Sequence, residues 1–339
     1  MRIAINGFGR IGRTFLRTIL LDKKALTTLE IAVINIGPAN PEKIAHMFTY
    51  DTIMGKFPGS VRMESNTLII DEIIKIAIIA QTDSAQLNWK KYNIDWVVDA
   101  SGQYTKREDS EKHIEAGAKY VLISAPAKNE DISIIPGVNE TTFNPQKDHI
   151  VSLGSCTTNA LVTTLYTFHQ AFGIEECFIT TIHAYTNSQV LLDVEDHDLR
   201  RARAAALNII PTTTGASKML IKILPELDNK VSALAIRVPV AVVSLLDISF
   251  IAKKPVSKET INDAFLKASQ NQMKGIMGFS TEPLVSSDFI GSSFSVAIDG
   301  LLTKTVGSLA KVFGWYDNEW GYSMRLKDFL LYANTKTQG

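Results

Sequence analysis

The stretch Ile-Ala-Ile-Asn-Gly-Phe-Gly-Arg-Ile-Gly at residues 3–12 decides the fold of the N-terminal part of the chain. Its apolar start predicts a short buried strand, and apolar residues at four-residue intervals through Ile19 predict one face of a helix. Glycines at the spacing of Gly7, Gly9 and Gly12 let a strand turn tightly into a helix and let the backbone approach a pyrophosphate. Without flanking elements the pattern indicates only a glycine-rich turn, but between a strand and a helix it predicts a dinucleotide-binding turn.

The alternation of strand and helix continues after this turn. Further strands are predicted at Glu30–Asn35, Ile94–Ala100, Tyr120–Ser124 and His149–Leu153, with a helix within Lys106–Ala118. Strands that alternate with helices form parallel sheets covered on both faces. The N-terminal part is therefore predicted to be an α/β Rossmann-type dinucleotide-binding domain.

The pattern changes after residue 153. One helix is predicted at Thr260–Ser269, where Ser257 can act as its N-cap. Longer strands are predicted at Phe178–His183, Val231–Val238, Val242–Ala252, Val285–Phe289, Phe294–Asp299 and Leu309–Trp315. The expected second domain is α+β and catalytic, with a mostly antiparallel sheet. A helix at Gly321–Thr335 is expected to pack back on the first domain, so the predicted boundaries are 1–154 with 320–339 for the dinucleotide-binding domain and 155–319 for the catalytic domain.

The composition limits the classes of function. A length of 339 residues suits two domains, and 35 basic against 35 acidic side chains give no overall field that would recruit nucleic acid or an anionic membrane. The N-terminus lacks the apolar core of a signal peptide, and no apolar stretch is long enough to span a membrane. The two cysteines cannot form a disulfide framework, and no histidine pair has metal-ligand spacing with a nearby Cys or carboxylate. We expect a cytoplasmic protein without a metal, nucleic-acid or membrane partner.

A reactive thiol is predicted within Ser155-Cys156-Thr157-Thr158-Asn159, where a strand meets a helix that runs to about Phe172. A cysteine at a helix start feels the positive end of the macrodipole, which lowers its pKa and supplies N–H donors for an oxyanion. Most cysteines are small buried hydrophobes, and Cys177 is expected to be one. His183, at a predicted strand end, is the expected partner, because an imidazole beside a thiol can form an ion pair and exchange a proton with the substrate.

Several motifs together resemble one enzyme family. They are Asn-Gly-Phe-Gly-Arg-Ile-Gly at 6–12, Ser-Cys-Thr-Thr-Asn at 155–159, His-Ala-Tyr-Thr at 183–186, Asp-Leu-Arg-Arg-Ala-Arg at 198–203, Thr-Thr-Thr-Gly-Ala at 212–216 and Trp-Tyr-Asp-Asn-Glu-Trp-Gly-Tyr at 315–322. In this order they resemble phosphorylating glyceraldehyde-3-phosphate dehydrogenase, from residue 1 to about 332. The resemblance implies that an aldehyde is oxidised with NAD and inorganic phosphate to 1,3-bisphosphoglycerate, in glycolysis or gluconeogenesis, by a homotetramer whose 184–206 loop is buried.

The resemblance also implies roles for individual residues. Cys156 would form a hemithioacetal and then a thioester, with His183 as the base. Substrate or phosphate binding is implied for Ser155, Thr157, Thr186, Arg201, Thr214, Gly215 and Arg237. Cofactor binding is implied for Asn6, Gly7, Phe8, Gly9, Arg10, Ile11, Gly12, Asn35, Ile36, Ser101, Gly102, Ser124, Asn318 and Tyr322, with Asn318 on the nicotinamide carboxamide.

Cofactor preference is the point at which the sequence departs from the family. A dinucleotide site of this type usually has an acid at the end of its second strand, which grips the adenosine ribose. Here Ile36 follows Asn35, so NADP is an alternative to NAD, although no Lys or Arg follows until Lys43. We hypothesise that Glu195, in a loop that reaches a neighbouring subunit in the family, supplies the missing carboxylate and preserves NAD preference.

Further departures lie near the expected phosphate site. Ser188 stands where an Asp is common, and Val240-Ala241-Val242 replaces a usual Thr-Pro-Asn. Three alternatives stay open at this point. They are an NADP-preferring form of the same enzyme, an erythrose-4-phosphate dehydrogenase, and a catalytically silent nucleotide-binding protein on the same scaffold.

Overall fold

The structure is a computed structural model that describes residues 1–337. The chain divides into two compact units. The first unit contains Met1–Ile134, Glu140–Gly154 and the chain from Ser323 onward. The second contains Ile135–Asn139 and Ser155–Tyr322.

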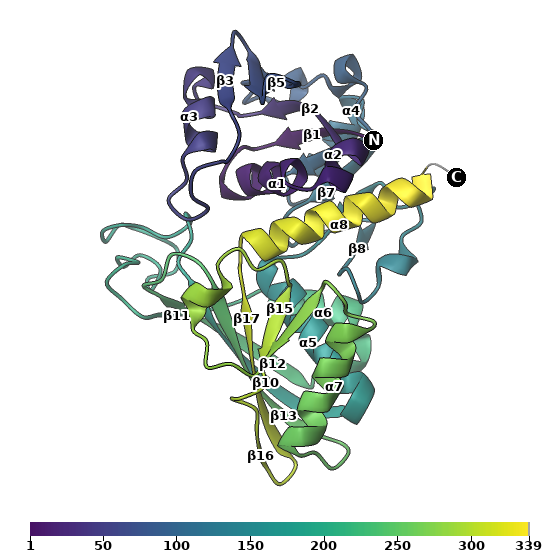
Figure 1. The fold of residues 1–339 in the computed structure, drawn as a ribbon, viewed down its shortest axis with the longest axis vertical. Helices are drawn as coiled ribbons and strands as arrows, with labels where there is room; N and C mark the ends of the chain where they lie inside the picture. The colour runs from purple at the N-terminus through teal and green to yellow at the C-terminus, as the bar shows by residue number, and fades with distance from the viewer. Residues whose placement is uncertain (338–339) are drawn as a thin grey trace. The chain divides into compact units, whose positions relative to one another are not determined.

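The first unit is built on a nine-stranded sheet whose strand order is β3-β4-β5-β2-β1-β6-β7-β9-β8 (Figure 1). Its strands are β1 (Arg2–Asn6), β2 (Glu30–Asn35), β3 (Val61–Glu64), β4 (Thr67–Ile70), β5 (Ile74–Ile79), β6 (Trp96–Asp99), β7 (Tyr120–Ile123), β8 (Ile132–Ser133) and β9 (Ile150–Ser152). The pairs from β5 through β2, β1, β6, β7 and β9 to β8 are parallel, and β3 to β5 pair antiparallel. The chain moves outward from β1 in both directions, which is the switch point where α/β sheets bind ligands.

Helices complete the first unit. They are α1 (Arg10–Leu20), α2 (Lys23–Thr28), α3 (Ile44–Thr49), α4 (Arg107–Glu115) and most of α8 (Trp320–Thr337). The C-terminal helix α8 packs on this unit, since Phe329 meets Trp96 edge to face at 5.8 Å and Lys327 Nζ lies 2.6 Å from the Asp22 carboxylate. The predicted Rossmann-type domain with a returning C-terminal helix is confirmed.

The second unit contains an eight-stranded, mostly antiparallel sheet. Its strands are β10 (Ile174–Ala184), β11 (Ile210–Thr212), β12 (Val231–Val238), β13 (Ser244–Ala252), β14 (Met277–Ser280), β15 (Val296–Asp299), β16 (Lys304–Val306) and β17 (Leu309–Tyr316). Only the pairs β10 with β12 and β14 with β15 are parallel among its named strands. The predicted α+β fold is confirmed.

Helices cover one face of this second sheet. They are α5 (Cys156–Phe172), α6 (Ala216–Ile223) and α7 (Lys258–Gln270). Ser257 caps α7 as expected, because its hydroxyl accepts the Thr260 N–H. Under the helices lies an apolar core in which Phe168 stacks on Phe250 at a centroid distance of 4.0 Å. This apolar layer packs α5 against the sheet.

One predicted strand is wrong. Residues 285–289 were expected to be extended, but Ser286–Phe289 forms a 3₁₀ turn. The Asp288 carboxylate accepts the Val285 N–H at 2.8 Å, and Asp288 N donates to Val285 O at 3.0 Å. Short polar side chains satisfy the backbone locally in this way and compete with a sheet ladder.

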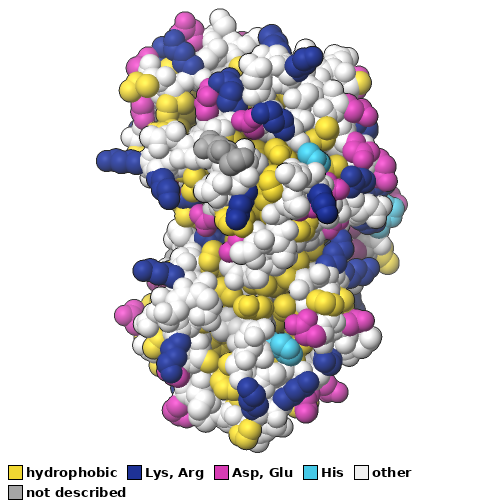
Figure 2. Space-filling view, turned by 90° about the vertical axis from the view of Figure 1, so that its right-hand side faces the viewer, with side chains coloured by type: hydrophobic (Ala, Val, Ile, Leu, Met, Phe, Trp, Pro, Cys, Tyr) yellow, Lys and Arg dark blue, Asp and Glu magenta, His cyan; other side chains and the backbone are white. Residues whose placement is uncertain are grey.

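The face drawn in Figure 2 agrees with the neutral composition. On the face drawn in Figure 2, Lys and Arg side chains are interspersed with Asp and Glu, and no broad area carries a single sign. Within residues 1–337, no helix is both long enough and apolar enough to cross a lipid bilayer.

Candidate active site

Cys156 is the first residue of α5. Ser155 is the N-cap, and its hydroxyl accepts the Thr158 N–H at 3.1 Å and lies 2.8 Å from Thr158 Oγ1. This cap fixes the first turn of the helix, where unpaired N–H groups favour negative charge. Cys156 Sγ lies 3.6 Å from His183 Nε2, so the structure brings the two predicted catalytic residues together.

His183 lies near the end of β10, and the sheet register places Arg237 of β12 directly beside it. His183 Nδ1 is 2.6 Å from Ala184 O and 2.8 Å from Arg237 Nη1, and Arg237 Nη1 donates to Ala184 O at 2.9 Å. Because a guanidinium only donates, Nδ1 needs a lone pair to bond Arg237 but a proton to bond Ala184 O. In the tautomer whose Nδ1–H donates to Ala184 O, Nε2 keeps a lone pair directed at the thiol. This tautomer is the one that can accept the proton of Cys156.

His183 is buried and Cys156 is partly buried, and the loss of solvent around them decides their protonation. Burial raises the pKa of the Cys156 thiol. Burial, with Arg237 as a second cause, lowers the pKa of His183 to about 3. A thiolate alone or an imidazolium alone is therefore disfavoured. The start of the helix was predicted to lower the thiol pKa, but the effect of burial is larger and raises it. A proton that passes from Sγ to Nε2 creates both charges at once, so we expect the two groups to ionise as a pair.

A buried phenol supports this pair, and no motif in the sequence indicates this role. Tyr316 is 1% exposed, and its hydroxyl lies 2.7 Å from Thr181 Oγ1 and 3.0 Å from Thr157 Oγ1. The Tyr316 ring meets the His183 ring edge to face, at a centroid distance of 6.0 Å. One hydroxyl thus connects the first turn of α5 to β10.

The predicted phosphate-binding arginines have different surroundings. Arg237 is partly buried, and its Nε has no hydrogen-bond partner within the described chain. Arg201 Nε donates to Thr212 Oγ1 at 2.8 Å, and that hydroxyl donates to the Asp198 carboxylate, also at 2.8 Å. A side-chain relay therefore holds Arg201 beside β11, whereas Arg237 has an open donor.

The remaining phosphate-site residues lie on loops. Thr186 Oγ1 lies 2.9 Å from Ser188 Oγ, so the serine that replaces a common Asp bonds the residue it flanks. Thr214 Oγ1 accepts the Ala216 N–H at 3.2 Å. Gly215 precedes α6, and a Cβ built there meets no atom within 4 Å. Helix starts with open space beside free N–H groups suit anions.

The glycine turn of the first unit fits a dinucleotide. Gly7 has φ +94°, and a Cβ there would lie 2.6 Å from the Ser101 backbone. A Cβ on Gly12 would lie 2.2 Å from Gly7 O, whereas one on Gly9 would meet nothing within 4 Å. Gly7 and Gly12 therefore serve packing, and Gly9 leaves open space at the start of α1, where a pyrophosphate is expected.

Buried polar groups join the carboxyl ends of β1, β2 and β6. Asn6 Nδ2 donates to Asp99 at 2.7 Å, and Asn35 Nδ2 donates to Asn6 Oδ1 at 2.8 Å and to Gln81 O at 3.0 Å. His113, which is fully buried, lies 3.2 Å from Asp99 and accepts Trp89 Nε1–H at 3.0 Å. These amides are engaged with one another, so Asn6 and Asn35 shape the site more than they offer free donors.

The other predicted cofactor residues lie in α1, in loops after the strands of the first unit, or in the second unit. Arg10 forms an ion pair with Asp51. Ile36 is 6% exposed, and its N–H donates to Ile79 O, so an apolar side chain occupies the position of the usual acid. Phe8, Ile11, Ser101, Gly102 and Ser124 lie in the first unit, whereas Asn318 and Tyr322 lie in the second.

Comparison with known proteins decides the family. Residues 1–107 match the glyceraldehyde 3-phosphate dehydrogenase NAD binding domain, and residues 155–318 match the C-terminal domain of the same family. The chain is 44% identical over 338 residues to a glyceraldehyde-3-phosphate dehydrogenase of Geobacillus stearothermophilus, covering 99% of both chains. It is also 44% identical over 331 residues to glyceraldehyde-3-phosphate dehydrogenase 2 of Bacillus subtilis, covering 97% of this chain and 96% of the relative. The chain belongs to the glyceraldehyde-3-phosphate dehydrogenase family.

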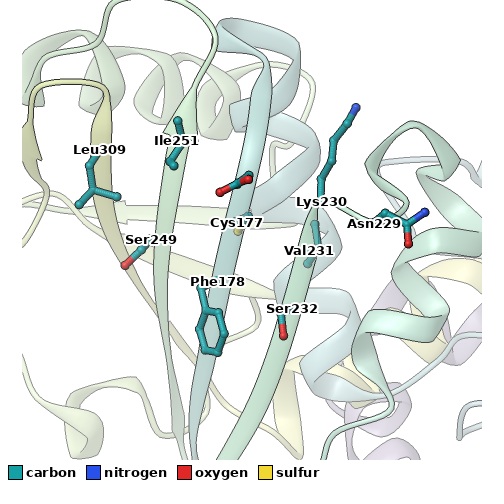
Figure 3. A pocket seen from close by; sticks show the side chains of 10 residues that line it. Cys177, Phe178, Asn229, Lys230, Val231, Ser232, Ser249, Ile251 and Leu309 are labelled. Carbon is teal, nitrogen blue, oxygen red and sulfur yellow. The ribbon is translucent and has the colours of Figure 1, made fainter.

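This membership confirms the family resemblance of the motifs. It also identifies the first unit as the family's NAD-binding domain. The second unit also has a surface pocket that lies away from the predicted active site. A hollow of about 370 Å³ lies over Cys177, Phe178 and Ser232, at the end of β10 remote from His183 (Figure 3). No residue that the family resemblance assigns to chemistry lines it. Cys177 itself is 5% exposed, and burial raises the pKa of its thiol, as expected for a packing cysteine.

Proposed function

We propose that this protein is a phosphorylating glyceraldehyde-3-phosphate dehydrogenase that uses NAD. The reaction would convert glyceraldehyde 3-phosphate and inorganic phosphate to 1,3-bisphosphoglycerate. Family membership supports the activity. The 3.6 Å contact between Cys156 Sγ and His183 Nε2, at the start of a capped helix, is the observation that carries the chemistry.

The residues of the chain account for each step. Cys156 passes its proton to His183, and the thiolate bonds to the aldehyde carbon while the C=O π pair moves to the oxygen. The protonated His183 gives its proton to that oxygen, which yields a hemithioacetal and leaves the imidazole neutral again. NAD, when bound, accepts the hydride. As the hemithioacetal hydroxyl loses its proton to His183, the C–H electron pair leaves as hydride and Cys156 holds a thioester. Phosphate oxygen then bonds to the acyl carbon, and the C–S bond breaks to restore the thiolate.

Anion binding falls to groups near this thiol. The open Nε of Arg237 supports a role on the substrate phosphate, together with Thr186. Arg201, Thr214 and Gly215, with Ser155 and Thr157 on α5, would bind the attacking phosphate. Thr157 Oγ1 lies 3.9 Å from Sγ, which is consistent with that assignment.

The domain roles are part of the proposal. Residues 1–154 with 320–339 would bind the dinucleotide, and residues 155–319 would carry catalysis. Asn318 would contact the nicotinamide carboxamide. We include a cytoplasmic location, which the two free cysteines support.

The test is the appearance of reduced cofactor, followed by ultraviolet absorbance, with glyceraldehyde 3-phosphate, NAD and phosphate. Activity that depends on phosphate and is lost in Cys156→Ser, but kept in Cys177→Ala, supports the proposal. A higher kcat/KM for erythrose 4-phosphate would favour the other dehydrogenase, and nucleotide binding without turnover would favour a silent binding protein. Matched rates with NADP test the choice of cofactor.

We also propose a homotetramer. Large apolar side chains of the loop after β10 are exposed in the isolated chain, with Leu191 at 86%, Leu199 at 81% and Leu207 at 78%. Exposed apolar groups gathered in one loop are typical of an interface. Light scattering coupled to size-exclusion chromatography should give four chains per particle, and Leu199→Glu should lower that number.

A further inference from the structure

Ser244 lies at the first position of β13 and is 1% exposed. Its hydroxyl accepts the Ala184 N–H at 3.1 Å, and this backbone group follows His183 directly. The same hydroxyl donates to Asn318 Oδ1 at 3.3 Å. Ser244 is therefore the hydrogen-bonded neighbour of the residue expected to orient the nicotinamide.

The backbone that delivers Ser244 is strained. Val243, 3% exposed, has φ +68°, a left-handed conformation that β-branched residues rarely adopt. Such strain persists only where the surrounding structure imposes it, and it often accompanies function. Here it sets the direction in which the chain enters β13, and with it the place of the Ser244 hydroxyl.

Asn318 has an open donor. Its side chain is buried, at 5% exposure, and its only hydrogen bond within the described residues is the one that its oxygen accepts from Ser244. The Nδ2 group therefore has no partner in residues 1–337. An amide that is held through its oxygen and left with free N–H groups is complementary to a carbonyl oxygen.

We infer that Ser244 is a positioning residue that fixes the polarity of Asn318, so that its N–H groups face the carboxamide oxygen of the nicotinamide. The inference rests on the proposed function, because that function supplies the nicotinamide. The Ser244 hydroxyl accepts from Ala184 and also lies within hydrogen-bonding reach of the Tyr316 hydroxyl, which can donate to it. With both of its lone pairs used in this way, its one proton is directed at Asn318 and holds the oxygen of the amide inward. Without the hydroxyl, the amide can turn, and a carbonyl would face a carbonyl.

Direct titration by calorimetry, with no aldehyde present, tests the inference. NAD and ADP-ribose share every group except the nicotinamide. In Ser244→Ala we expect the Kd for NAD to rise about fivefold, the effect of one hydrogen bond, while the Kd for ADP-ribose is unchanged. A parallel rise for both ligands would show a general structural defect and overturn the inference, as would no change for either.

A matched control separates the hydroxyl from the burial of a serine. Ser295 is also buried in the second unit, at 4% exposure, and its hydroxyl has no partner within the described chain. Ser295→Ala should bind both ligands as the unmodified protein does. If it weakens NAD alone to the same extent, the hydrogen bond to Asn318 is not the cause.

A double-mutant cycle shows whether Ser244 acts through Asn318. Asn318→Ala should weaken NAD, and adding Ser244→Ala to it should change the Kd no further. Additive losses would overturn the inference. Alkylation of Cys156 should stay within about twofold in Ser244→Ala, because an effect through His183 would slow it instead. Failure of the proposed function is distinct, since the unmodified protein would then show no turnover.

Discussion

The glycine turn of the first unit and the thiol site of the second unit differ in the groups that they offer to a ligand. The first offers its backbone, and the second offers its side chains. Around Gly7 the side chains of Asn6, Asn35 and Asp99 bond to one another, and the backbone is left to meet the ligand. Around Cys156 the side chains themselves stay available, with open donors on Arg237 and Asn318. A backbone site tolerates little change of shape, whereas a side-chain site tolerates little change of chemistry.

The largest expected effect breaks the side-chain site. His183→Asn should lower kcat about 10³-fold, because no base then accepts the thiol proton. The sign of the pH dependence follows from the buried thiol, whose pKa is raised. Without imidazole, the thiolate should form only at alkaline pH, so alkylation of Cys156 should begin at a higher pH than in the unmodified protein. Alkylation rates from pH 5 to 10 measure this, and an unshifted profile would contradict the pairing.

A substitution of Arg237 tests the binding of the substrate phosphate at the same site. Arg237→Leu should raise the KM for glyceraldehyde 3-phosphate about 30-fold, since a charge-assisted contact is lost. Unphosphorylated glyceraldehyde supplies the control, because it lacks the group that Arg237 is proposed to bind. Equal losses of kcat/KM for the two aldehydes would instead show that Arg237 acts by positioning His183 and not by binding the phosphate.

Substitutions of Gly12 and Gly9 test the backbone site of the first unit. Gly12→Ala should destabilise the protein by about 3 kcal/mol, because its Cβ would lie 2.2 Å from Gly7 O. Gly9→Ala has open space and should change the free energy of unfolding by less than about 1 kcal/mol, yet raise the KM for NAD about tenfold. Urea unfolding and NAD kinetics of the two variants measure the difference. If Gly9→Ala is strongly destabilised, Gly9 serves packing and the assignment to cofactor binding is wrong.

Glu195 should have the smallest effect. The buried Ile36 leaves no acid after β2, and Glu195 is exposed in the isolated chain. If Glu195 reaches the ribose of a neighbouring subunit, Glu195→Gln should lower the ratio of kcat/KM for NAD over NADP about fivefold. An unchanged ratio means that NAD preference has another origin, and rates with both cofactors decide it.

Local features of the fold and the site were predictable, and non-local ones were not. The glycine turn and the start of α5 at Cys156 depend on residues close in sequence. The contacts of Tyr316 with Thr157 and Thr181 join segments 159 and 135 residues apart, so no spacing indicated them. His113 has an ordinary helical context in the sequence but is fully buried against Asp99. Residues 286–289 form a turn because local polar bonds prevail over apolar pattern.

The phosphate and cofactor roles came from the family resemblance and stay predictions. The amide of Asn35, one of the predicted cofactor residues, is engaged with Asn6 and Gln81. The thiol was expected to have a lowered pKa, but burial raises it. Burial depends on the whole packed unit, so no stretch of sequence around Cys156 reveals it.

The unequal burial of Cys156 and Cys177 gives the protein an internal standard for purity. A thiol reagent applied to the native protein should consume one equivalent per chain, and the same reagent in denaturant should consume two. The difference between the two titres counts the chains through Cys177, and the native titre divided by this difference gives the fraction of chains with a competent nucleophile. Specific activities of different preparations and variants can then be expressed per working site instead of per milligram.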